Sequence, residues 1–370
     1  MKYYIIAGEP SGDLHGSNLM KAILVRDPNA EFRYWGGDHM ASVADGMITH
    51  IRETSIMGFT EVIKNISKIK GFFKKAKATI QEFQPDKIIY IDYPGFNLRM
   101  AEWSKKEGFY NVFYISPQLW AWKKGRVKKV KKYIDDMVCI LPFEKDFYAE
   151  HGVEVHYVGH PLLPIIQNFK PDPNFVEKYN LSGKKVLAVL PGSREQEIIK
   201  MLPEFISAAL KYKSQFQIVL AAAPNVSPSF YSSILGEYKN QITIVGNDTY
   251  NLLSIADLAI VTSGTATLET ALFKVPQVVC YKTSSINYAI GKRLVDLKYI
   301  CLVNLILDYG LVTELIQNEA EVDQITDALN DTLLREHEIK LGYEELIKTL
   351  SNNNISASDE VSRIVTTEVI

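Results

Sequence analysis

Cysteine, histidine and long hydrophobic runs are all scarce in this chain. Its 370 residues hold three cysteines, Cys139, Cys280 and Cys301, which stand far apart in apolar contexts. They are expected to be core residues in a reducing cytosol, and they exclude a disulfide framework or a Cys-x-x-Cys site. No pair among the seven histidines has ligand spacing with a third donor nearby, so no metal site is expected. No run approaches the roughly 20 apolar residues of a spanning helix, so we expect a soluble or peripheral protein.

A strong excess of charge of one sign is missing as well. The 41 basic and 43 acidic residues leave a formal net charge of −2, which argues against a general nucleic-acid binder. Neither the Gly-x-Ser-x-Gly elbow nor the P-loop occurs in the sequence. The chemistry must therefore come from other patterns.

What is present is an alternation of short apolar runs with longer amphipathic ones, which predicts an α/β fold with helices on both faces of parallel sheets. The chain is too long for one core, and four of its 15 prolines fall between 160 and 174, which indicates an interdomain linker. We predict an N-terminal domain at 1–165, a C-terminal domain at 175–340, and a helical tail at 341–370 that packs on the first domain or on a partner subunit. Strands are expected at 3–7, 32–35, 87–91, 111–115, 136–141, 155–158, 185–190, 217–222, 242–245, 258–261 and 277–281, and helices at 16–26, 69–83 and 100–106.

Two glycine-centred turns, 192–194 and 263–265, carry the strongest signal. Each follows an apolar strand and precedes a helix-like stretch. Such turns let backbone N–H groups and a helix N-terminus approach a phosphate, and an arginine adds a planar cation suited to its oxygens. Either turn alone is also an ordinary feature of a βα unit. Together they predict a site for a diphosphate-bearing ligand, formed by Gly192, Ser193, Arg194, Ser263, Gly264 and Thr265, with Glu269 downstream.

Carboxylates follow two strands of the first half. Glu9, Ser11 and Asp13 come after the first strand, where open α/β sheets place ligands, although Ser11 or Asp13 serves equally well as a helix cap. Asp92 ends the apolar strand at 87–91 and precedes a proline turn. A partly buried carboxylate there suits a general base, with the cap of a turn or helix as the alternative.

Two segments combine lysines with apolar residues. Seven of the ten residues 123–132 are basic, and 56–75 keeps apolar residues at helical spacing with lysines on the other face. Both suit an anionic membrane surface, and both are equally typical of ordinary helices with a solvated face. Two tryptophans after the strand at 111–115 are placed to meet sugar faces or acyl chains, or to pack in the core. The candidates are Trp120, Trp122, Lys64, Lys68, Phe72, Phe73, Lys128 and Lys132.

Eight segments, which include several of the candidate residues, occur in the order of a known family. They are Ala-Gly-Glu-Pro-Ser-Gly-Asp at 7–13, Ile-Met-Gly at 56–58, Ile-Asp-Tyr-Pro-Gly-Phe-Asn at 91–97, Ser-Pro-Gln-Leu-Trp-Ala-Trp at 116–122, Leu-Pro-Phe-Glu at 141–144, Val-Gly-His-Pro at 158–161, Leu-Pro-Gly-Ser-Arg at 190–194 and Ser-Gly-Thr-Ala-Thr-Leu-Glu at 263–269. In these segments the chain resembles the lipid-A-disaccharide synthases of Gram-negative bacteria, over nearly its whole length.

The resemblance implies a GT-B fold, in which two Rossmann-like domains face each other across a cleft. It implies an inverting transfer of 2,3-diacylglucosamine from UDP to the 6-hydroxyl of 2,3-diacylglucosamine 1-phosphate, giving the β-1,6-linked disaccharide 1-phosphate and UDP. Enzymes of the family need no metal or organic cofactor and work on the cytoplasmic face of the inner membrane, and a homodimer is left open. The family implies Glu269 as the ribose ligand and Asn304 as a further donor-site residue. Asp92 is the preferred base, with Glu9 and Asp13 as rivals that alternatively orient the acceptor.

Two other functions are compatible with the two turns. A UDP-sugar 2-epimerase of similar architecture would need further carboxylates and a histidine around the donor sugar, and no acyl-binding surface. A non-enzymatic nucleotide-sugar sensor would keep the turns but would need neither a base at Asp92 nor a membrane face.

Overall fold

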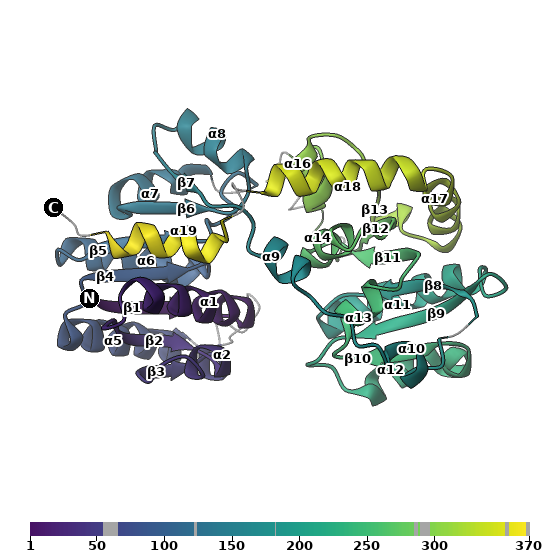
Figure 1. Ribbon diagram of the computed structural model, residues 1–370, viewed down its shortest axis with the longest axis horizontal. Coiled ribbons are helices and arrows are strands. Elements are labelled where there is room, and N and C mark those ends of the chain that lie inside the picture. The colour runs from purple at the N-terminus through teal and green to yellow at the C-terminus, as the bar shows by residue number, and fades with distance from the viewer. Residues whose placement is uncertain are drawn as a thin grey trace. The chain divides into compact units, whose positions relative to one another are not determined.

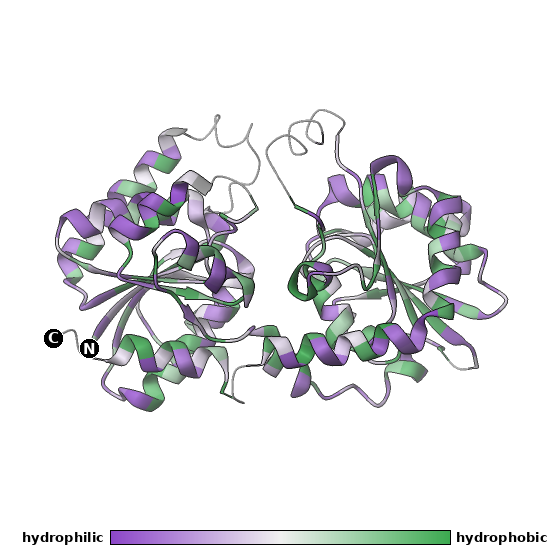
Figure 2. Ribbon diagram, turned by 90° about the horizontal axis from the view of Figure 1, so that it is seen from above, coloured by the Kyte–Doolittle hydropathy of each residue, from purple (hydrophilic) through white to green (hydrophobic). Residues whose placement is uncertain are grey.

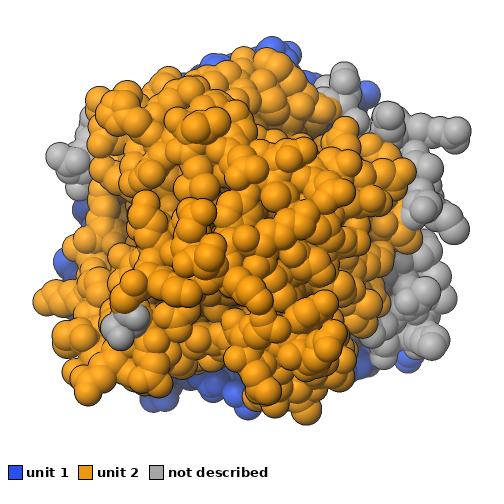
Figure 3. Space-filling view, turned by 90° about the vertical axis from the view of Figure 1, so that its right-hand side faces the viewer, with its two compact units in different colours: residues 1–161, 351–370 blue, residues 162–350 orange. Residues whose placement is uncertain are grey.

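The computed structural model describes residues 1–54, 66–121, 124–181, 183–284, 288, 297–351 and 355–367. The chain forms two compact units (Figure 1, Figure 3). Unit 1 comprises Met1–Pro161 together with Ser351–Ile370, and unit 2 comprises Leu162–Leu350. Unit 1 is therefore assembled from both ends of the chain, whereas unit 2 is continuous.

Unit 1 is built on a parallel sheet whose strand order, in the described part of the chain, is β3-β2-β1-β4-β5-β6-β7. The chain steps outward from β1 to β3, then returns to β4 beside β1 and steps outward the other way. Ala7 at the end of β1 lies opposite Ile91 at the end of β4. The strands are β1 (Lys2–Ala7), β2 (Glu31–Gly36), β3 (Met47–His50), β4 (Lys87–Ile91), β5 (Tyr110–Tyr114), β6 (Asp136–Cys139) and β7 (His156–Tyr157).

Alternate side chains of these strands enter two cores, one on each face of the sheet. Tyr3 and Ile5 belong to the core that α1 and α19 cover, whereas Tyr4 and Ile6 belong to the core that α5 to α8 cover. This period of two is the one expected for strands buried on both faces. The helices of unit 1 are α1 (Pro10–Arg26), α2 (Asp38–Ala41), α3 (Ile51–Thr54), α5 (Ile66–Phe83), α6 (Pro94–Lys106), α7 (Val127–Tyr133), α8 (Phe143–Glu150) and α19 (Ala357–Thr366), with a 3₁₀ turn, η1, at Lys124–Arg126.

Unit 2 repeats the same plan with the strand order β10-β9-β8-β11-β12-β13 among its described residues. Leu187 and Val189 face the core under α11 and α17, and Val186 and Ala188 face the core under α10 and α13. The strands are β8 (Lys185–Leu190), β9 (Phe216–Ala222), β10 (Thr243–Gly246), β11 (Leu258–Thr262), β12 (Gln277–Tyr281) and β13 (Thr313–Ile316). The helices are α9 (Leu162–Gln167), α10 (Phe175–Lys178), α11 (Glu195–Leu210), α12 (Pro228–Leu235), α13 (Thr249–Leu253), α14 (Thr265–Leu272), α16 (Leu302–Leu307), α17 (Val322–Leu334) and α18 (Glu336–Leu350), with 3₁₀ turns η2 (Gly236–Gln241) and η3 (Gln317–Glu319). Figure 2 shows that hydrophilic and hydrophobic residues mix along the helices of both units, as expected for helices with one covered face.

The α/β fold predicted from the alternation of runs is confirmed, and every predicted strand overlaps an observed one. Two strands, β3 and β13, were not predicted. Both are four residues long, lie at sheet edges, and have mostly half-buried side chains, so neither leaves an apolar run in the sequence. The predicted tail is divided, because α18 belongs to unit 2 and α19 to unit 1.

Helix α1 begins six residues before its predicted start, at a proline that suits the first helical position. The glycines that make this stretch look like a loop are needed for close packing. A Cβ on Gly16 would come within 2.6 Å of the Met40 sulfur, and one on Gly12 within 3.2 Å of the Ala7 Cβ. Helix α6 likewise begins at Pro94, well before residue 100.

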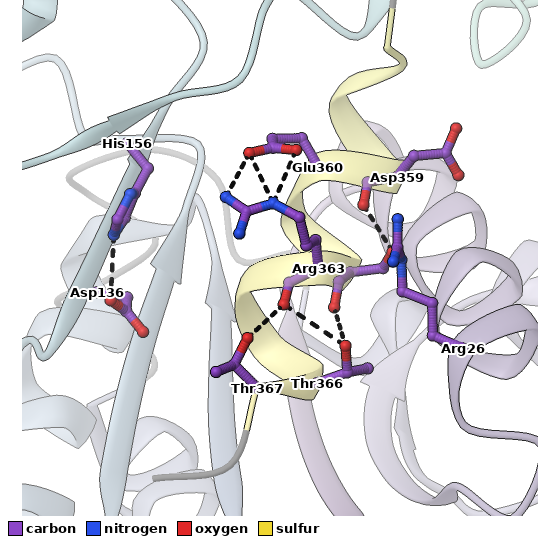
Figure 4. A network of polar contacts seen from close by, with 9 residues as sticks. Arg26, Asp136, His156, Asp359, Glu360, Arg363, Thr366 and Thr367 are labelled. Atoms are coloured by element: carbon purple, nitrogen blue, oxygen red, sulfur yellow. Dashed lines mark hydrogen bonds and ion pairs between the residues drawn. The ribbon is translucent and has the colours of Figure 1, made fainter. Parts of the chain in front are cut away.

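Helix α19 is held in unit 1 by a buried lysine at the start of β4. Lys87 is 2% exposed, and its Nζ donates to the carbonyl oxygens of Ile364 (3.3 Å) and Thr367 (2.7 Å). These carbonyls end the helix, where intrahelical partners run out and a cation is favoured by the helix dipole. On the neighbouring side Arg26 Nε of α1 donates to Ser362 Oγ at 2.8 Å (Figure 4). The C-terminal end and the middle of α19 are thus fixed by polar contacts, while Val361 and Val365 pack in the core.

Replacing Lys87 by Met is expected to loosen α19, because the apolar side chain leaves the buried carbonyl of Ile364 and the partly buried carbonyl of Thr367 without this donor. The free energy of unfolding of unit 1 should fall by about 1–3 kcal/mol. Denaturant unfolding measures this loss, and hydrogen exchange at 357–366 localises it. The control is Lys21→Met on the exposed side of α1. Equal effects of the two substitutions would contradict the role given to Lys87.

Candidate active site

A pocket lies in unit 2, at the point where the strand order reverses. β8 and β11 are neighbours, with Leu190 opposite Val261, and the chain leaves them toward opposite edges of the sheet. The carboxyl ends of strands at such a reversal are the usual ligand site of open α/β sheets. A pocket of about 210 Å³ opens there. It is lined by Leu190, Gly192, Ser193, Glu197, Ala221, Ala222, Ala223, Pro224, Thr249, Thr262, Ser263, Gly264, Thr265, Ala266 and Glu269.

Both predicted turns form part of this pocket. The turn at 192–194 leads into α11 and the turn at 263–265 leads into α14, so two helix N-termini begin at its edge. Gly192 has a φ of 113°, a conformation that other residues rarely adopt, and a Cβ there would lie 2.8 Å from Glu197 Oε2. Unpaired N–H groups and helix dipoles at such ends attract anions. Gly192, Ser193, Ser263, Gly264, Thr265 and Glu269 are therefore brought together as the sequence predicts.

Glu269 lies on the wall of the pocket with one oxygen already held. Its Oε1 accepts a hydrogen bond from the Tyr250 hydroxyl at 2.9 Å, while burial raises the pKa of the carboxyl group. Thr262, which sequence reasoning missed, also lines the pocket. It is 5% exposed, and its buried hydroxyl finds no hydrogen-bond partner among the described residues. A buried hydroxyl without a partner is costly, so a ligand that bonds it would relieve that cost.

Two predicted donor-site residues do not line the pocket. The Arg194 side chain is 64% exposed and pairs with Glu197 at 3.0 Å. Asn304 is buried at the start of α16, and its amide bonds the backbone of Val312 and the carboxylate of Glu314. Its hydrogen-bonding groups are thus used to hold the segment before β13. These contacts favour a structural role for Asn304, and the ligand contact that the resemblance implies stays a prediction.

Unit 1 places Asp92 at the equivalent point of its own sheet, between the ends of β1 and β4. Asp92 and Tyr93 both have left-handed backbone conformations, with φ of 45° and 48°. Burial, and then the charge of Glu9, raise the pKa of Asp92 to about 6, although a hydrogen bond from the Tyr93 N–H offsets part of the shift. A carboxylate with that pKa is ionised at neutral pH and is a better base than an ordinary aspartate.

Asn97 and Gly8 stabilise this turn. The Asn97 amide nitrogen donates to the carbonyls of Asp92 (2.8 Å), Ile91 (3.3 Å) and Ile6 (3.3 Å), which ties the ends of both strands together. The Tyr93 ring lies where a side chain on Gly8 would be, 2.4 Å from the position of a Cβ. A glycine is therefore required beside Asp92.

Asp13 and Glu9, the two rivals of Asp92 for the role of base, make different contacts. Asp13 is buried, and its carboxylate accepts from the backbone N–H groups of Gly37 (2.6 Å), His39 (3.0 Å) and Met40 (3.1 Å). These bonds fix the turn into α2, which favours the structural alternative for Asp13. Glu9 precedes α1 without capping it through its side chain, and it acts on Asp92 through its charge. Ser11 is exposed in the first turn of α1.

The aromatic candidates are packed inside unit 1. Trp120 is 9% exposed, its indole N–H donates to Glu144 at 3.3 Å, and its ring meets Phe143 edge to face. Phe73 stacks on Phe96 with ring centroids 4.3 Å apart, and Phe72 meets Trp35 at 5.8 Å. These contacts favour the core-packing alternative for all three. Trp122 and Lys64 lie outside the described residues.

The lysine candidates that the structure describes are exposed. Lys68 lies on α5, and Lys128 and Lys132 lie on α7. Both helices cover the same face of the sheet, the one that buries Tyr4 and Ile6. In the described ranges no helix is both long and apolar enough to cross a bilayer.

Comparison with known proteins then identifies the family. A family model described as lipid-A-disaccharide synthetase matches residues 3–365. The chain belongs to this family. A lipid-A-disaccharide synthase from Trichlorobacter lovleyi is 36% identical over 345 residues, which cover 92% of this chain and 90% of that one. One from Coxiella burnetii is 35% identical over 370 residues, covering 98% and 96%.

Solved structures with the same fold include relatives of both enzyme classes considered from the sequence. The glycosyltransferase of kitacinnamycin aligns with a TM-score of 0.66 at 11% identity, over 98% of each chain. UDP-GlcNAc 2-epimerase from Neisseria meningitidis, solved with UDP-GlcNAc bound, aligns with a TM-score of 0.61 at 11% identity, over 99% of this chain and 98% of that one. At these identities the likeness shows the fold alone, and it confirms the predicted GT-B class.

Membership of the lipid-A-disaccharide synthase family confirms the resemblance drawn from the eight segments. The chain is a hexosyltransferase of lipid A biosynthesis, and the 2-epimerase and sensor alternatives are not favoured. The two glycine turns line one pocket in the structure, as the sequence pattern predicts.

Proposed function

We propose that this lipid-A-disaccharide synthase transfers 2,3-diacylglucosamine from UDP to the 6-hydroxyl of 2,3-diacylglucosamine 1-phosphate, with inversion at the anomeric carbon. The observation that carries the proposal is the pocket of unit 2. The turns of two strand-turn-helix motifs meet at its edge, where helix N-termini suit an anion, in a chain that belongs to this family. A direct test incubates the protein with both lipids and follows disaccharide 1-phosphate and UDP. Release of a 2-epimer from UDP-GlcNAc, without disaccharide formation, would instead favour the epimerase alternative.

The pocket supports a division of roles around the donor. Amide groups at the starts of α11 and α14 are available to the diphosphate, and Arg194 adds a cation beside the first turn. Glu269 is oriented by Tyr250 and offers its second oxygen to the ribose hydroxyls. The Thr262 hydroxyl is a further contact of this pocket.

Arg194→Ala is expected to weaken UDP binding by at least about tenfold, because a charge-assisted contact to phosphate contributes roughly 1.5–3 kcal/mol. Titration calorimetry with UDP measures the change. Lys200→Ala, which removes an exposed lysine later in α11, is the matched control and should leave UDP affinity within about twofold. Unchanged UDP affinity in a folded Arg194→Ala variant would remove Arg194 from the site.

Asp92 is proposed as the general base of the transfer. In an inverting displacement the acceptor hydroxyl loses its proton as it attacks, and a carboxylate within hydrogen-bond reach accepts it. The pKa of about 6 keeps Asp92 ionised at neutral pH. Turnover should therefore fall as pH drops below about 6 and Asp92 becomes protonated.

Asp92→Asn should lower turnover by about 10²–10⁴-fold and leave UDP affinity unchanged. It should also raise the free energy of unfolding at pH 7 by about 1–3 kcal/mol. The sign follows from the pKa, which rises from 3.8 to about 6 on folding. Ionisation of Asp92 therefore lowers the free energy of unfolding as pH rises from 3.8 to about 6. Asparagine carries no charge and also tolerates a positive φ, so the variant avoids this loss. Steady-state rates and denaturant unfolding give the two readouts, with Glu9→Gln as the comparison. If Asp92→Asn keeps more than a tenth of native turnover, the base role passes to Glu9.

We also propose that unit 1 meets the anionic cytoplasmic face of the inner membrane through the lysines of α5 and α7. Both substrates carry acyl chains, and these exposed lysines share one layer of the unit. A basic residue near such a surface contributes roughly 1 kcal/mol, screened by salt.

Charge reversal to Glu at Lys68, Lys128 and Lys132 should reduce binding to anionic vesicles at least about tenfold at low salt, and should make it less salt-sensitive. Vesicle co-sedimentation at two ionic strengths measures both effects. The same reversal at Lys200, Lys239 and Lys348, exposed lysines of unit 2, is the control. A native protein that does not bind anionic vesicles at low salt would overturn the membrane proposal.

A further inference from the structure

Glu197 occupies the phosphate side of the donor pocket with its own carboxylate. Its Oε2 accepts a hydrogen bond from the Ser193 N–H at 3.2 Å, and its Oε1 accepts one from Arg194 Nη1 at 3.0 Å. The carboxylate also lies over Gly192, where a Cβ would be 2.8 Å from Oε2. Glu197 is itself among the residues that line the pocket, and its two oxygens contact the first turn.

These two donors are the ones that a diphosphate would use. One N–H group cannot be given fully to a carboxylate and to a phosphate oxygen at the same time, and the two anions repel each other at short distance. No lysine or arginine is among the residues that line the pocket in the described chain, and the cation beside the first turn, Arg194, is already paired with Glu197. Binding of the donor therefore requires the Glu197 carboxylate to give up its contacts.

The geometry points to Glu197 as an internal competitor of the donor diphosphate. Its carboxylate breaks its hydrogen bonds with Ser193 and Arg194 when a nucleoside diphosphate binds, and re-forms them when UDP leaves. This competition weakens product binding and favours release. This assignment rests on the proposed function of the pocket. It makes Glu197 a residue that sets affinity for the diphosphate and takes no part in bond making.

A purely structural role for Glu197 predicts the opposite result. An acidic residue in the first turn stabilises a helix, and an Arg–Glu pair at i, i+3 orients both side chains. If that were its purpose, neutralising Glu197 would disorder the turn and weaken binding of UDP. The two roles thus differ in the sign of the effect on affinity.

The test compares Glu197→Gln with Glu195→Gln by calorimetry, using UDP, inorganic pyrophosphate and uridine as probes. Glu195 lies in the same first turn but does not line the pocket, so its substitution removes the same charge away from the ligand. We expect Glu197→Gln to bind UDP and pyrophosphate about three- to tenfold more tightly, with uridine affinity unchanged because uridine has no phosphate. Glu195→Gln should change UDP affinity by less than about twofold. Inhibition of turnover by UDP should strengthen by the same factor in Glu197→Gln.

Weaker or unchanged UDP binding by a folded Glu197→Gln variant overturns the inference. Equal tightening of UDP binding by Glu195→Gln, or tighter binding of uridine by Glu197→Gln, overturns it as well. Glu197→Ala provides a second variant and should tighten UDP binding in the same direction, which keeps the test decisive if the glutamine variant is unstable. A native protein that binds no UDP overturns the assignment of the pocket and this inference with it. Native UDP binding without tightening in the variants overturns the inference alone.

Discussion

Both candidate sites depend on one pairing of strands in each sheet. The first strand of the sheet pairs with the fourth, which the chain reaches after adding two strands toward one edge. β1 pairs with β4, and β8 pairs with β11. The chain leaves the two paired strands toward opposite edges of the sheet. The loops at their carboxyl ends are therefore not covered by a crossover helix. Glu9 and Asp92 follow one such pair, and the turns at 192–194 and 263–265 follow the other. The candidate site residues of each unit therefore lie at the same topological point.

Much of this arrangement was predictable, because it depends on local patterns. Apolar runs buried on both faces mark the strands, and small residues directly after them mark the turns. The contributions of Thr262 and Glu197 were not predictable, because each depends on where a side chain points. In the sequence Thr262 is a small residue that follows the apolar strand at 258–261, and Glu197 is an acidic residue of the helix-like stretch after the first turn. Asn304 shows the reverse case, since its polar side chain serves the packing of the β13 segment.

The turn at Asp92 places strained backbone at the residue proposed as the general base. Two consecutive non-glycine residues in the left-handed region cost about 1–3 kcal/mol each. The contacts of Asn97 with three carbonyls and the stacking of Tyr93 and Phe96 hold the backbone in that form. As a result the Asp92 carboxylate is held partly out of water beside Glu9, which is the physical origin of its raised pKa. Sequence alone marked Asp92 as the end of a strand, but it gave no sign of the strained backbone.

The return of the chain to unit 1 has a consequence for the order in which the protein folds. Unit 2 is a continuous segment, so every residue of its core is synthesised before α19 is made. Unit 1 lacks Val361, Ile364 and Val365 until α19 emerges, and the face of β1 and α1 that they cover stays exposed to water until then. The N-terminal half is thus the last to be completed, and a fragment ending at the linker would carry an uncovered apolar surface.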